Sequence, residues 1–159
     1  MKTSNLERMI QLAEEFFATK NDPTQISVTE DVMARLRRIH HATMSEQNEG
    51  NGPVAWILLI PTTQDLMEQF IAKKVNEQEL LAKTPLEGRY EAVYLCSALV
   101  LPEHRGKGLA KELTIRGVKS IKADHPIKSL FYWAFSREGA KLASSVARDC
   151  GLPLFQRPG

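Results

Sequence analysis

The chain has 159 residues, the size of one domain with one hydrophobic core, so we expect a single domain over residues 1–159. Charged residues make up 25% of the sequence and the formal net charge is +2, a basic excess too small to indicate a nucleic-acid partner. No run approaches the ~18 apolar residues of a membrane span, and Met1–Lys20 lacks the apolar centre of a signal peptide, so we expect a cytoplasmic protein without membrane contact.

The first third of the chain is expected to hold two helices and a loop. Ser4-Asn-Leu-Glu7 has the pattern of a capping box, and apolar residues recur at helical spacing after it, which predicts a helix over about 5–19. A second helix is expected to begin at Thr29, with an inward face of Val32, Met33, Leu36 and Ile39. The segment Ser45–Pro53 contains Glu, Gln, Asn and Gly, and we expect it to be a flexible loop.

A buried strand and two short helices are expected next. Val54–Ile60 is a continuous apolar run bounded by Gly-Pro and Pro-Thr-Thr, which is typical of a central strand buried on both faces. Thr62 or Thr63 then caps a third helix that reaches Ile71, and Asn76 opens a short fourth helix. Both helices fall within residues 64–83.

The second half of the chain predicts a strand, helix, strand, helix order. Val93–Leu101 is apolar almost throughout, as a central strand should be, and an amphipathic helix is expected from Gly106 to about Ile121. A right-handed crossover would place the next strand, Ser129–Phe135, parallel to the first. A last helix is expected over 136–150, and Leu152–Gly159 leaves room for at most one short strand.

The turn between the strand at 93–101 and its following helix carries two glycines, Gly106 and Gly108. A glycine in a helix costs about 1 kcal/mol relative to alanine, so some other requirement must favour both of them. One such requirement is close approach of an anion to the free N–H groups of the helix start, and the alternative is a glycine needed for packing. A Walker A loop and a dinucleotide fingerprint both fit this turn less well, because the glycines and hydroxyl that they need are missing.

The motif Arg105-x-x-Gly108-x-Ala110, preceded by Val100-x-Pro102, resembles the acyl-coenzyme A signature of the GNAT superfamily of N-acetyltransferases over residues 93–121. The resemblance implies an α/β (α+β) three-layer fold, whose central mixed sheet has splayed parallel strands and is flanked by helices. The helical segment at 64–83 and the short C-terminus would be atypical for that family, since its equivalent strands normally join by a short turn.

The same resemblance implies an acetyl-coenzyme A site. The pantetheine arm would lie along the main chain of Ala98, Leu99 and Val100. The pyrophosphate would lie in the turn and the helix start, formed by Arg105, Gly106, Lys107, Gly108, Leu109, Ala110 and Lys111. The neighbouring His104 is expected to contact the nucleotide or solvent.

The implied reaction is transfer of an acetyl group to a primary amine of a small molecule or peptide. The N–H of Cys96 could polarise the acetyl carbonyl. Glu91 is the candidate general base, as the only carboxylate in its strand, and Tyr132 is the candidate acid, with Tyr94 as a third candidate. An exposed strand-end acid and buried core tyrosines are the alternative interpretations of these residues.

Two departures from the family pattern, the short C-terminus and the lack of a tyrosine on the last helix, favour another hypothesis. No tyrosine follows Tyr132, although family members often carry one on the last helix, where Ser144 or Ala147 stands here. The alternative is therefore a catalytically degenerate sensor or protein-interaction module that binds coenzyme A. An RNA-associated protein is a third hypothesis, which rests on Arg37, Arg38 and the lysines after Gly106. The chain is expected to be a monomer or a homodimer.

No metal site is expected from the sequence. His40 and His41 are adjacent, and adjacent side chains on a helix point about 100° apart, so we interpret them as a solvated helix end. Cys96 and Cys150 form neither a disulfide framework nor a metal-ligand spacing, and both are expected to be reduced thiols.

Overall fold

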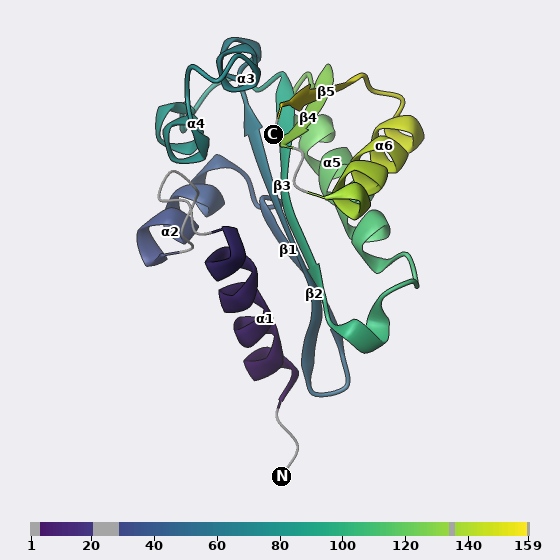
Figure 1. The fold of residues 1–159 in the computed structure, drawn as a ribbon. Helices are drawn as coiled ribbons and strands as arrows, with labels where there is room; N and C mark the ends of the chain where they lie inside the picture. The colour runs from purple at the N-terminus through teal and green to yellow at the C-terminus, as the bar shows by residue number, and fades with distance from the viewer. Residues whose placement is uncertain (1–3, 21–28, 134–135, 159) are drawn as a thin grey trace.

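The computed structural model describes residues 4–20, 29–133 and 136–158. A five-stranded sheet in the order β1-β2-β3-β4-β5 forms its centre (Figure 1). The strands are β1 (Met44–Glu49), β2 (Gly52–Thr62), β3 (Ala92–Val100), β4 (Ser129–Trp133) and β5 (Leu154–Arg157). The helices are α1 (Asn5–Lys20), α2 (Glu30–Ile39), α3 (Gln64–Ile71), α4 (Glu77–Lys83), α5 (Leu109–Asp124) and α6 (Arg137–Cys150), with a short 3-10 turn at Pro102–His104.

The sheet is mixed and lies between two layers of helices. Strands β1, β2 and β3 pair antiparallel in chain order, whereas β3, β4 and β5 pair parallel. Helices α1 to α4 lie on one side of the sheet, and α5 and α6 lie on the other (Figure 1). The expected α/β fold with a central mixed sheet flanked by helices is therefore confirmed.

Residues 45–53 are not the flexible loop that their composition indicated. They form most of β1, a tight turn and the start of β2, and the Glu46–Trp56 pair links the two strands through a 3.0 Å bond from Trp56 Nε1 to Glu46 Oε2. β1 is an edge strand with most of its side chains partly or fully exposed, so polar residues are tolerated there. A hydrophobic pattern could not reveal a strand that buries so little.

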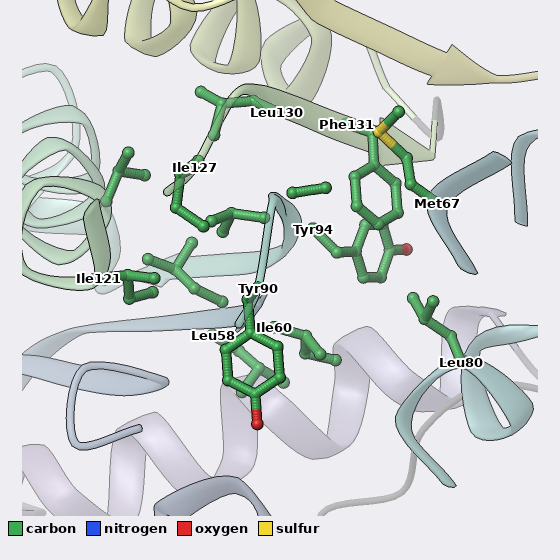
Figure 2. Close-up of a cluster of buried hydrophobic side chains, with 14 of the residues drawn as sticks. Leu58, Ile60, Met67, Leu80, Tyr90, Tyr94, Ile121, Ile127, Leu130 and Phe131 are labelled. Carbon is green, nitrogen blue, oxygen red and sulfur yellow. The ribbon is translucent and has the colours of Figure 1, made fainter. Parts of the chain in front are cut away.

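Helices α3 and α4 connect two strands that are neighbours in the sheet. The two strands that they connect, β2 and β3, are direct antiparallel neighbours from Ala55–Val100 to Thr62–Ala92. Phe70 of α3 packs its ring against Tyr94 and Phe131, with centroids 4.8 and 5.7 Å away. Figure 2 shows Tyr94 and Phe131 together in this buried cluster, with Met67 of α3 and Leu80 of α4 at its border. The α3–α4 connection is thus part of the main core.

The parallel strands β3 and β4 separate soon after they begin. Their pairing covers only Ala92–Tyr94 on β3 and Ser129–Phe131 on β4. Beyond this point β3 continues along β2 to Val100, and β4 continues along β5 to Trp133. The expected splay of the two parallel strands is therefore present, and it opens toward the carboxyl ends of both.

Gly117 allows α5 to lie close to β2. A Cβ atom added at this position would lie 2.7 Å from Cδ1 of Leu59, a side chain that is 1% exposed. We predict that Gly117→Ala lowers the free energy of unfolding by about 1–3 kcal/mol, because the surrounding core leaves Leu59 little room to move. Urea unfolding measures the change.

The Leu59→Ala background is the control for this prediction. Removal of the Leu59 side chain removes the clash, so Gly117→Ala should there cost little or should stabilise by about 0.5–1 kcal/mol, as alanine usually does in a helix. Equal costs in the two backgrounds would show that the close approach does not require the glycine.

Candidate functional site

The gap between β3 and β4 is bordered on one side by a partly exposed stretch of β3. Val93 and Tyr94 are fully buried, whereas Leu95 to Ala98 are only partly buried. The N–H of Leu101 donates to the Val54 carbonyl of β2 (2.9 Å), and main-chain groups alternate in direction along an antiparallel strand. The main-chain groups of Ala98 and Val100 therefore face the gap, and those of Leu99 face β2.

A β-bulge lies within this partly buried stretch of β3. Leu95 is opposite Leu59 and Ser97 is opposite Leu58, so β3 carries one extra residue, Cys96, at this point. Bulges are frequent beside active sites because they redirect a residue relative to its neighbours. The residue that was expected to lie near a thioester is thus the bulge residue.

The glycine turn follows β3 and leads into α5. Gly106 and Gly108 have φ angles of 81° and 78°, in the left-handed region that favours glycine. Helix α5 begins at Leu109, so Gly108 is its N-cap and the expected helix start at Gly106 is wrong by one turn. A Cβ atom added at either glycine would meet nothing within 4 Å, so the space in front of the turn is open.

Six consecutive N–H groups of this segment are available to a ligand. The first main-chain bond of α5 runs from the Glu112 N–H to the Gly108 carbonyl (3.0 Å). Within the described residues, the N–H groups from Gly106 to Lys111 have no acceptor in the protein. A helix start with free N–H groups and its positive dipole end is suited to an anion.

The basic side chains of the turn are mostly engaged within the protein. Arg105 Nε donates to the Val100 carbonyl (3.0 Å), and Lys111 Nζ lies 2.9 Å from Asp149 Oδ2 on α6. The hydrogen bond with Lys111 is the main cause of the lowered pKa of Asp149. Lys107 Nζ is 3.4 Å from Nδ1 of His104. Because the basic side chains have these contacts, most of the hydrogen-bond donors that the turn presents to an anion are main-chain N–H groups.

His104 and Glu103 connect the segment before the turn to the rest of the protein. His104 Nδ1 lies 3.2 Å from Glu49 Oε2 at the end of β1, and its side chain is 18% exposed. Arg8 of α1 makes two bonds to the Glu103 carboxylate, of 2.5 and 2.6 Å. These contacts fix the turn relative to α1 and the β1–β2 hairpin.

A buried carboxylate lies at the point where β3 and β4 separate, and the sequence interpretation missed it. Glu77, the first residue of α4, is 2% exposed and accepts a hydrogen bond from the Tyr94 hydroxyl. Cys96 Sγ lies 3.8 Å from the same oxygen, Oε2 of Glu77. Burial is the main cause that raises the pKa of Tyr94 well above its usual range, and Cys96 and Glu77 add to it.

The two catalytic candidates taken from the sequence lie apart from this cluster. Glu91 lies just before β3, at the end where β3 and β4 pair with each other. Its partly exposed carboxylate lies 3.3 Å from Lys128 Nζ. Glu91 is three residue steps from Tyr94 along the chain, or about 10 Å. Tyr132 is buried, and its hydroxyl donates to Gln156 Oε1 (3.1 Å). Because Phe131 and Trp133 contact Phe70 of α3, alternation directs Tyr132 to the opposite face, toward α5 and α6.

The histidine pair is not a solvated helix end. Helix α2 ends at Ile39, His40 is buried in an extended conformation, and its ring stacks on His41 with centroids 4.2 Å apart. Together with Asp124 they place three possible metal-ligand atoms within 4.8 Å of one another. However, Nδ1 of His40 accepts the Ala42 N–H (3.0 Å), so Nε2 carries the hydrogen and donates it to Asp124 (2.7 Å). The His40 nitrogen that faces the possible metal position, Nε2, therefore carries a proton, and the three residues form a hydrogen-bond cluster.

Comparisons of the chain with protein-family models and with curated proteins give no match. Within the described ranges, no helix combines the length and the apolar character that crossing a membrane requires.

The Arg8–Glu103 pair gives a pH test of the anchor beside the turn. Hydrogen bonding to Arg8 is the main cause that lowers the pKa of Glu103 from 4.5 to about 2. Because the folded-state pKa is depressed, the pair stabilises the fold above pH 4.5, and this contribution is lost as the pH falls from 4.5 toward about 2. We predict that Arg8→Gln raises the pKa of Glu103 from about 2 toward 4.5, as followed by carboxyl ¹³C NMR, because the main cause of the lowered pKa is removed.

Arg116→Gln is the matched control, because Arg116 makes a similar exposed pair with Glu112 on α5, at 3.6 Å. It should leave the Glu103 titration unchanged. A Glu103 carboxyl that titrates near 4.5 in the unmodified protein would contradict the anchor.

Proposed function

We propose that this chain is an acetyl-coenzyme A-dependent N-acetyltransferase of the GNAT type that transfers the acetyl group to a primary amine. The observation that carries the proposal is the joint presence of the β3–β4 gap and, at the end of β3, a turn whose N–H groups are free. A diphosphate suits the turn, and an extended arm with amide groups suits the strand edge.

The geometry restricts how the arm would bind. Main-chain groups of Ala98 and Val100 face the gap and can pair with an amide-bearing chain as a neighbouring strand would. Those of Leu99 face β2, so we assign the arm to Ala98 and Val100. Arg105 donates to the Val100 carbonyl and would exchange this bond when the arm binds.

The chemistry follows from where an arm in the gap would place its thioester. The acetyl group would approach the bulge at Cys96, where an N–H directed at the carbonyl oxygen stabilises the tetrahedral intermediate. The thiolate would leave on the α5–α6 face, where Tyr132 is the candidate donor of a proton.

The turn should bind coenzyme A through its main chain more than through its lysine. Gly108→Val forces a side chain into a left-handed conformation at the N-cap, and several hydrogen bonds to the diphosphate, of roughly 1.5–3 kcal/mol each, depend on that geometry. Lys107→Ala removes one exposed charge worth about 0–1 kcal/mol. We predict at least a tenfold loss of coenzyme A affinity for the first variant and less than about fivefold for the second, by titration calorimetry.

Gly151→Val controls for backbone strain, because Gly151 has a φ of 67° and caps the far end of α6. It should lower stability without changing coenzyme A affinity. A larger loss from Lys107→Ala than from Gly108→Val would contradict the main-chain account.

A second candidate function is a coenzyme A-binding module without turnover. The observation in its favour is on α6, where Ala147 is buried in the core, Ser144 is exposed and no tyrosine is present. We predict that the protein releases free thiol from acetyl-coenzyme A when primary amines are supplied, followed with a thiol reagent. Tight coenzyme A binding without thiol release above background for any amine tested would favour the module.

A further inference from the structure

We infer that Glu77, which helices α3 and α4 bring to the base of the β3–β4 gap, receives the proton of the acceptor amine, and that the acceptor enters from the α1–α4 face of the sheet. This inference rests on the proposed acyl transfer. It assigns the role of base to a residue of α4 in place of Glu91.

The first argument is position. Glu77 contacts Tyr94, the last residue of β3 that pairs with β4, and Cys96, the bulge residue just beyond it. Tyr94 is fully buried, but Cys96 is partly exposed. The carboxylate therefore lies where the two strands separate, beside a residue of β3 that is partly exposed, Cys96.

The second argument is that α4 is fixed in place at both ends. Arg157 of β5 donates to the Val75 carbonyl (2.7 Å), just before Glu77, and its guanidinium stacks on Phe70 and Trp133 at 4.4 and 4.7 Å. At the other end, Arg35 of α2 donates to three carbonyls, of Leu81, Ala82 and Thr84, at 2.7–3.0 Å. A catalytic carboxylate requires this kind of support, because small displacements reduce the rate strongly.

The third argument is chemical. A carboxylate accepts protons, and an acceptor ammonium is a cation that must lose a proton before its nitrogen can attack. The ammonium gives one proton to Glu77, and its nitrogen then forms a bond to the acetyl carbon. The carbon–sulfur bond breaks, and the second nitrogen proton passes to the thiolate, directly or through Tyr132. Glu77 releases its proton to solvent when the amide leaves.

The two faces of the sheet would then bind different substrates. Phe70 of α3 contacts Tyr94 and Trp133, which places Glu77 and its partners on the α1–α4 face, and Tyr132 lies on the α5–α6 face. The amine would approach from the first face, and coenzyme A, whose diphosphate suits the start of α5, would bind from the second.

The test compares Glu77→Gln with Glu91→Gln in the full chain. Glutamine keeps an oxygen that can accept the Tyr94 hydroxyl bond, so the change removes the basic group with little effect on packing. We expect kcat/KM for acetyl transfer to a simple primary amine such as ethylamine to fall about 100-fold or more in Glu77→Gln, with coenzyme A affinity within twofold of the unmodified protein. Glu91→Gln should keep the unmodified rate.

The pH profile separates a base from a structural carboxylate. Without Glu77 only the fraction of amine that is already neutral can react, so the rate of Glu77→Gln should rise about tenfold per pH unit up to the amine pKa, about 10, whereas the unmodified protein levels off earlier. Glu77→Asp keeps a carboxylate, and it should retain more activity than the glutamine variant and restore the plateau.

Two results would overturn the inference and leave the proposed function intact. One is a Glu77→Gln protein that binds coenzyme A and transfers acetyl groups within twofold of the unmodified rate, with an unchanged pH profile. The other is a loss of transfer in Glu91→Gln alone. Failure of the unmodified protein to bind coenzyme A would instead remove the proposed function and this inference together.

Discussion

The separation of β3 from β4 is the constraint on which the remaining features depend. Three residue pairs hold the strands together, and then each follows its other neighbour, β2 or β5. Within the described residues, the separation leaves the main-chain groups of Ala98 and Val100 that face away from β2 without a partner strand, and such groups must be satisfied by water, a side chain or a ligand. Arg105 satisfies one of them by donating to the Val100 carbonyl. The bulge at Cys96 and the buried Glu77 lie where this opening begins.

The connection formed by α3 and α4 places a polar side chain, Glu77, beside the opening. A two-residue hairpin between β2 and β3 would satisfy the pairing of these strands equally well, so the sheet itself does not need the two helices. Their apolar face joins the core through Phe70 and Leu80, and their polar start places Glu77 against Tyr94. The Thr62 and Thr84 hydroxyls, both buried and 2.7 Å apart, join the ends of this connection.

Local patterns predicted most elements of this fold, and each miss has its own physical cause. Val54–Ile60 and Val93–Leu101 were identified because buried central strands are apolar throughout. β1 was missed because an edge strand needs no such pattern. The His40–His41 pair was misinterpreted because the helix ends one residue before His40, and the hydrogen bond from the Ala42 N–H that sets its tautomer is a tertiary feature.

The two halves of the candidate site also differ in how far local sequence patterns predict them. The half proposed to bind coenzyme A lies within residues 93–111, where strand, glycines and helix start are contiguous, so a local motif can indicate it. The proposed acceptor half depends on Glu77, Tyr94 and Arg157, which are distant in sequence and meet only because α3 and α4 fold back onto β3 and β5. At the sequence level Glu77 is one acidic residue in a capping segment, and its burial depends on packing that no local pattern encodes. For the same reason the motif predicts a cofactor, whereas a prediction of the acceptor proposed above depends on the tertiary contacts made by α3 and α4.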